Sequence, residues 1–192
     1  MAQFARPDAD VTNTGTNGFA AVDESTPSDA DFWFGDNNTA EELEVSLSNV
    51  TDPSSSAGHT FRYRVAKTNA GTVDGGGNAV TVTARLMQGA TQIAADSAKT
   101  ATGTWTQYDF TLSGAEADAI TDYTDLRLEF VTSASGGSPA NRRGGAVSWA
   151  ELEVPDAAIT GLRMRMPHKT ISSRDGSTLA QDTVIPTLEP QL

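Results

Sequence analysis

The sequence predicts an all-β protein: an antiparallel jelly-roll β-sandwich of eight to nine strands, with one short helix and an extended C-terminal arm. Two observations carry this prediction. Apolar and polar residues alternate in short segments, and clusters of Gly, Asn, Asp, Ser and Pro separate those segments. Alternation gives a strand one face for a core and one face for water, as in antiparallel sheets.

Five segments show the alternation most clearly: 42–48, 60–66, 80–86, 107–112 and 126–130. In the first of them, Leu43, Val45 and Leu47 alternate with glutamate and serine residues. Weaker patterns predict further strands near 19–22, 32–34, 92–95 and 146–154.

One short helix is expected at about 113–120. Ser113 can cap its start, and Glu116 follows three residues later, as in a capping box. The helix would serve as a crossover turn between two strands. Loops at about 52–58, 72–78 and 133–145 are rich in Gly and Ser and are expected to form the contact-making tips of the sandwich.

Charge divides the 192-residue chain into two parts, which we take as domain 1–156 and arm 157–192. Up to Asp156 there are 22 acidic and 9 basic residues, a net charge of −13; the remainder has 3 acidic and 4 basic residues, a net charge of +1. An acidic body repels phosphate backbones and anionic lipid, so we expect no nucleic-acid partner and no membrane partner.

The sequence narrows both the possible cysteine chemistry and the expected location of the protein. The chain has no cysteine, which excludes disulfides, thiolate nucleophiles and Cys-based zinc sites. The first ten residues, MAQFARPDAD, have no apolar core of the signal-peptide type, so we expect synthesis in the host cytoplasm without a signal peptide.

The arm is polar and too poor in apolar residues to bury a core, so something outside it is expected to hold it. Within it, Leu162, Met164 and Met166 alternate with Arg163 and Arg165. An extended strand of this kind could pair with a sheet edge of another copy, its arginines meeting acidic surface. The alternative is that the arm folds back on its own sandwich.

The three tryptophans, Trp33, Trp105 and Trp149, each stand on the opposite phase to the apolar residues of their own segment. If the strand phases hold, all three point away from the main core. A large exposed ring costs hydration, so each is a sugar-stacking platform, part of a subunit interface, or covered by the chain's own loops. A β-bulge would also shift the phase.

The residue types of common active sites are scarce or isolated, so no enzyme activity, catalytic residue or cofactor is expected. His59 and His168 are far apart, and Ser113 and Ser148 lack the glycines of a nucleophile elbow. The tandem arginines Arg142 and Arg143 are expected to face water.

Carboxylates are plentiful, which leaves a paired-acid glycosidase as the least favoured alternative. Loop acids could instead hold a structural Ca²⁺, or merely face solvent. Those acids are Asp8, Asp10, Asp23, Glu24, Asp29, Asp31 and Asp36.

Five stretches of the sequence resemble small jelly-roll proteins encoded in the structural gene clusters of tailed phages and prophages. They are RPDADVTNTG (6–15), AAVDESTPSDADF (20–32), LSNVTDPSSSAGHTFRYRVAK (47–67), WTQYDFTLSGAEADAITDYTDLRLEF (105–130) and VSWAELEVPDA (147–157). Such proteins look like carbohydrate-binding modules and are virion components. The resemblance covers about 6–157, lies in fold-determining segments and implies no functional residue.

The resemblance implies a non-enzymatic virion structural protein on the exterior of the head or tail. We expect a capsid decoration or cement subunit whose arm binds major capsid or tail proteins and copies of itself. The alternatives are a tail or tail-tip component, or a module that binds a host surface glycan through its tryptophans.

Overall fold

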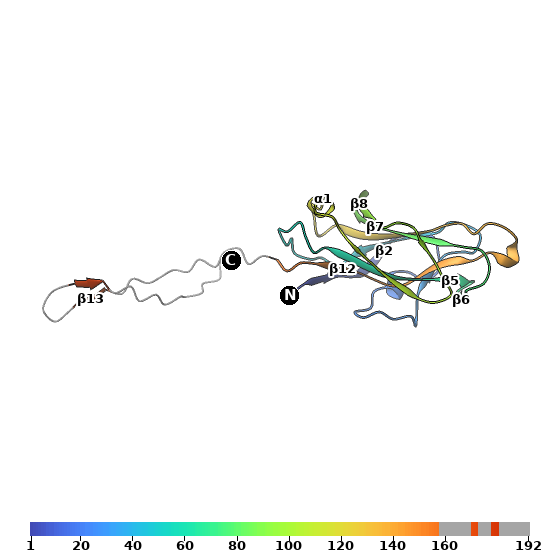
Figure 1. Cartoon of the computed structure of the whole chain (residues 1–192), viewed down its shortest axis with the longest axis horizontal. Coiled ribbons are helices and arrows are strands. Elements are labelled where there is room, and N and C mark those ends of the chain that lie inside the picture. Colours follow the sequence, from blue (N-terminus) through green and yellow to red (C-terminus); the bar gives the residue numbers. More distant parts are fainter. Residues whose placement is uncertain (158–169, 173–177, 181–192) are drawn as a thin grey trace. The chain divides into compact units, whose positions relative to one another are not determined.

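The computed structural model describes residues 1–157, 170–172 and 178–180 (Figure 1). The chain divides into two compact units, Met1–Ala157 and Ala158–Leu192. In the second unit, strands β13 (Thr170–Ser172) and β14 (Thr178–Ala180) pair in antiparallel fashion. The predicted arm strand lies outside the described residues, as do all its expected interface residues and His168. Those interface residues are Leu162, Arg163, Met164, Arg165 and Met166.

The first unit consists of two six-stranded sheets, each built from antiparallel pairs. The first sheet runs in the order β1-β12-β5-β10, with β3 beside β12 and β6 beside β5. Its strands are β1 (Gln3–Ala5), β3 (Trp33–Phe34), β5 (Thr60–Asn69), β6 (Thr72–Val73), β10 (Thr106–Thr111) and β12 (Gly144–Val154). The second sheet runs β2-β4-β11-β7-β8, with β9 beside β7. Its strands are β2 (Pro7–Asn13), β4 (Glu42–Leu47), β7 (Thr81–Gln88), β8 (Thr91–Ala95), β9 (Lys99–Thr100) and β11 (Leu126–Thr132).

The predicted alternation determines which side chains fill the space between the sheets. In the second sheet Leu128 lies opposite both Val45 and Leu86, and all three are fully buried. The sheets meet through aromatic rings such as those of Tyr63 and Phe130, whose centroids are 5.7 Å apart. The predicted antiparallel β-sandwich is therefore confirmed, with twelve strands where eight to nine were expected, because several short edge strands carry no alternation.

The predicted helix is present as α1 (Gly114–Asp118). The Ser113 side chain accepts a hydrogen bond from the Glu116 N–H, and the Glu116 carboxylate accepts one from the Ser113 N–H. This is the capping box that the sequence predicted. Among the described residues, no helix is long and apolar enough to cross a membrane.

Two predictions about individual strands are wrong. Residues 19–22 do not form a strand; Phe19–Ala21 is the 3₁₀ turn η1, and the Val22 carbonyl then accepts a hydrogen bond from the β12 residue Ala150. Trp33 does not point away from the core, because β3 pairs with β12 so that Trp33 lies opposite the core residue Val147. Trp33 is fully buried, and its neighbours Phe32 and Phe34 take the outward positions, half-buried.

Candidate functional site

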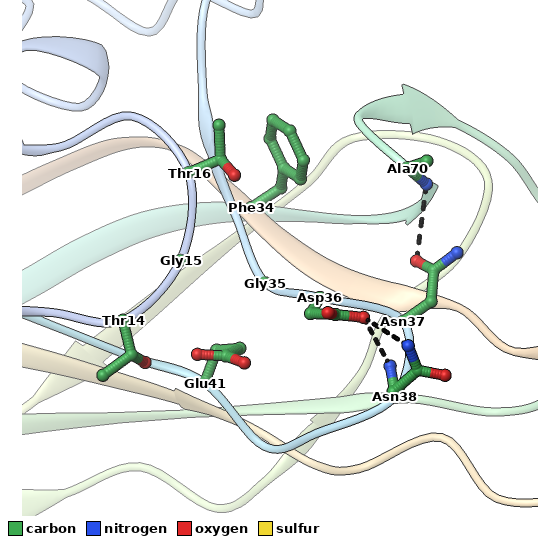
Figure 2. Close-up of a pocket in the computed structure, with 10 residues that line it drawn as sticks. All are labelled: Thr14, Gly15, Thr16, Phe34, Gly35, Asp36, Asn37, Asn38, Glu41 and Ala70. Carbon is green, nitrogen blue, oxygen red and sulfur yellow. Dashed lines mark hydrogen bonds between the residues drawn. The ribbon is translucent and has the colours of Figure 1, made fainter.

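A cavity of about 470 Å³ lies beside the short strand β3 (Figure 2). Its wall combines one aromatic ring with hydroxyl, amide and carboxylate side chains. The lining residues are Thr14, Gly15, Thr16, Phe34, Gly35, Asp36, Asn37, Asn38, Glu41 and Ala70. These residues come from three separate stretches of the chain, which the fold brings together.

The first wall, residues 14–16, is fixed to β3 by its backbone. Thr16 and Phe34 exchange two backbone hydrogen bonds, of 2.9 and 3.2 Å. Gly15 is required here because a Cβ at this position would lie 2.5 Å from Nε1 of Trp33. That indole Nε1 donates to Oδ1 of Asn13, which also accepts from the Gly15 N–H. The buried tryptophan therefore supports the wall from behind.

The second wall is the loop of residues 36–41 after β3. Oδ1 of Asp36 accepts hydrogen bonds from both the backbone and the side-chain amide of Asn38, as Figure 2 shows. The guanidinium of Arg142 donates to Oδ1 of Asn38 at 2.5 Å, and Nδ2 of Asn37 donates to Asn69 at 3.0 Å. Both amides are thus oriented before any ligand arrives, which reduces the entropy lost on binding.

The ring of Phe34 provides the apolar part of the cavity. It lies against the hairpin between β5 and β6, where Gly71 adopts a φ of +81°. A Cβ on Gly71 would stand 2.7 Å from Cζ of Phe34, so only glycine lets the ring take this place. The ring also meets Phe32, at a centroid distance of 5.9 Å, and Phe32 meets Trp105 edge-on at 5.2 Å.

The three predicted aromatic candidates have different surroundings. Trp33 belongs to the core, as described above, and Trp149 is only 3% exposed. Neither ring is accessible in the folded body, so neither can stack on a ligand there. Trp105 alone of the three is half-buried, and it sits in the row of rings that begins at the cavity.

Trp149 is covered by residues 22–31, which we call the covering segment. Its indole N–H donates to the Glu24 carbonyl at 2.8 Å. The Asp29 carboxylate holds the segment to the sheet by accepting from Arg64 of β5, at 2.7 and 2.9 Å, and from Ser148 of β12. This is the coverage by the chain's own loop that the sequence left as one alternative.

Two carboxyls of the covering segment have shifted pKa values. Burial raises the pKa of Glu24 to about 7; a backbone hydrogen bond opposes this, and the hydrogen bond and negative charge of Asp31 add to it. Burial also acts to raise the pKa of Asp29, but its hydrogen bonds from Arg64 and Ser148 outweigh burial and hold that pKa below its usual range.

The remaining residues considered for chemistry are occupied in structural contacts. His59 is fully buried, and its Nε2 lies 2.8 Å from the Tyr123 hydroxyl. Burial lowers the pKa of His59, which favours the neutral ring. Arg143, expected to face water, is instead 8% exposed and pairs with Asp74 at 2.7 Å. Within residues 1–157, 170–172 and 178–180, no three or more His, Cys, Asp or Glu side chains gather in a group that could hold a metal ion.

No protein-family model and no curated protein sequence matches this chain. Three of the solved structures that match are distant. A family 35 carbohydrate-binding module from an environmental isolate is 12% identical over 81% of this chain and 94% of the module, with a TM-score of 0.43. The glycoside hydrolase domain of Endo-D from Streptococcus pneumoniae is 11% identical over 79% of this chain and 21% of that chain, with a TM-score of 0.39. CBM51 from Clostridium perfringens GH95, in complex with methyl-galactose, is 14% identical over 79% and 88%, with a TM-score of 0.34.

Proposed function

We propose that residues 1–157 form a non-enzymatic glycan-binding domain and that the cavity beside Phe34 is its binding site. One observation carries the proposal: an accessible aromatic ring shares a cavity of about 470 Å³ with oriented amides, carboxylates and hydroxyls. Sugars present hydroxyl groups that need hydrogen-bond partners and C–H faces that pack on aromatic rings. The wall of this cavity offers both.

Binding without catalysis is favoured by the engagement of the candidate reactive groups elsewhere. His59 is buried against Tyr123, and the Ser148 hydroxyl donates to Asp29. Assays for release of reducing sugar from every glycan that binds would test this part of the proposal, and turnover would contradict it.

A glycan array followed by calorimetry tests the binding site. Substitution Phe34→Ala removes the ring and is expected to weaken the best-bound glycan about tenfold. Asn37→Ala is expected to weaken it less, by about threefold, because one neutral hydrogen bond is lost. The matched control is Phe4→Ala on β1, which removes a ring that is 42% exposed outside the cavity. Equal affinities for Phe34→Ala and Phe4→Ala would refute the assignment.

A second candidate function is attachment of this domain to the exterior of a tailed-phage virion, as a decoration, cement or tail component. Two observations favour it: the resemblance of about 6–157 to virion proteins, and the separation of Ala158–Leu192 from the sandwich as a unit of its own. Under this proposal the second unit contacts major capsid or tail proteins, or other copies of the chain.

Co-sedimentation with undecorated particles or tail tubes tests the attachment. The full chain should bind in a regular, saturable ratio, whereas a chain ending at Ala157 should not. The shortened chain retains the whole of the compact unit Met1–Ala157, including its last strand β12. Equal binding by both chains would exclude the second unit as the attachment device.

A further inference from the structure

We propose that the site takes an oligosaccharide rather than a single sugar, and that Phe32 and Trp105 contact its second and later units. This inference rests on the proposed glycan-binding function and extends it from the cavity to the row of three rings beside it. We call Phe34, Phe32 and Trp105 the aromatic ridge. It starts inside the cavity wall, because Phe34 belongs to both.

The ridge is continuous. Successive ring centroids are 5.9 and 5.2 Å apart, and the rings are inclined by 57° and 62° to one another. Each step is thus about the size of one sugar ring. A linear sugar chain that places one unit in the cavity would bring the following units over Phe32 and then Trp105.

The rings of the aromatic ridge are accessible, whereas the rings of Trp33 and Trp149 are not. Phe32, Phe34 and Trp105 are all half-buried, whereas Trp33 and Trp149 are covered by the chain itself. Half-buried aromatic surface keeps a hydration cost that a bound sugar face would remove. The fold thus covers two of its tryptophans and leaves the third beside the cavity.

Charge restricts which sugars fit. The cavity wall contains the carboxylates of Asp36 and Glu41, and none of its ten lining residues is basic. The guanidinium of Arg142 nearby is engaged with Asn38 and with the Gly137 carbonyl. An acidic sugar, such as a uronic or sialic acid, would be repelled by the carboxylates. The ligand class is therefore a neutral oligosaccharide.

The test is a chain-length series measured by calorimetry on the full chain. The probe is the best-bound neutral glycan of the array, trimmed from five units to one. Affinity should rise with each added unit up to about the third, roughly threefold to tenfold in total, as units reach Phe32 and Trp105. Trp105→Ala should abolish the gain from the later units, whereas Phe34→Ala should weaken glycans of every length. Phe4→Ala is again the matched control and should reproduce the wild-type series.

The outcomes separate this inference from the proposed function. Binding that depends on Phe34 but not on chain length or Trp105 would overturn the ridge and leave the cavity proposal standing. Absence of binding to any glycan on the array would overturn both. A preference for acidic over neutral glycans would overturn the assigned ligand class. If the chain ending at Ala157 gains length-dependent affinity that the full chain lacks, the second unit covers the ridge, and the ridge is not a sugar site in the full chain.

Discussion

Two parts of the outer face of the first sheet hold aromatic rings in different ways. Around Trp149, the covering segment closes over the ring and is held to the sheet by Asp29. Trp105 contacts the ring of Phe32, which in turn contacts Phe34, and all three rings stay half-buried. Both parts lie on the same sheet. The difference indicates that the fold can cover an outer aromatic with its own chain, so rings left accessible are candidates for external contact.

The largest expected effect comes from comparing Trp149→Ala with Trp105→Ala. Loss of the buried indole at position 149 leaves a cavity and should lower the free energy of unfolding by about 3–5 kcal/mol. Loss of the half-buried ring at position 105 should cost about 1–2 kcal/mol, because much of its surface is already in water. Urea unfolding of both variants measures the difference. Equal losses would mean that Trp105 is a structural residue, which would break the comparison.

Gly71→Ala tests how the ridge is held in place. The substitution forces a side chain into the left-handed region, at φ +81°, and against the ring of Phe34. It should lower the free energy of unfolding by about 1–2 kcal/mol and also change glycan affinity, because the ring must shift. Gly136→Ala is the matched control, since a Cβ at Gly136 would meet none of the described residues within 4 Å. Unfolding curves together with calorimetry would distinguish the two variants.

Asp29→Ala tests how the covering segment is held. It removes the acceptor of the Arg64 and Ser148 hydrogen bonds and should cost about 1–2 kcal/mol. Acrylamide should then quench the fluorescence of Trp149 more strongly. Asp29→Asn, which retains part of the hydrogen bonding, should lie between wild type and Asp29→Ala. Unchanged quenching in Asp29→Ala would mean that other contacts hold the segment closed.

Glu24→Gln gives the smallest effect and a pH dependence. The pKa of Glu24 is raised from 4.5 to about 7, so the folded state binds a proton more tightly than the unfolded state does. The stability from this group is therefore complete below about pH 4.5 and is lost as the pH rises through 7. Gln cannot ionise, so the free energy of unfolding of the variant should rise relative to that of wild type between pH 5 and 8. The expected rise is roughly 1 kcal/mol or less, because solvent screens a partly exposed carboxyl. A constant difference between the two proteins across this range would contradict the shifted pKa.

Much of the sandwich could be predicted because its central strands alternate. Leu43, Val45 and Leu47 were placed correctly, and so was the capping box of Ser113 and Glu116. Strand β2 was not predicted, since five of its seven residues are exposed and two register shifts interrupt its pairing with β4. Edge strands of this kind have no buried face to impose a pattern.

The candidate site could be predicted only in part. Trp105 was singled out by its phase, but the same reasoning failed for Trp33, because a two-residue strand is too short for alternation to define a face. The cavity has no sequence motif: its residues lie at 14–16, 34–41 and 70, and the pairing of β3 with β12 and with Thr16 brings them together. The burial of Arg143 could not be predicted either, because its ion-pair partner Asp74 lies in another loop.

The pairing of β1 with the end of β12 has a practical consequence. Gln3 lies opposite Val154, so the first strand of the body begins where its last strand ends. A short peptide could join these ends without crossing the sandwich, and a new opening could be made at the exposed Gly136. Such a circularly permuted body, or the body inserted whole into a surface loop of an unrelated carrier, should keep its fold and could display the cavity on a scaffold of choice.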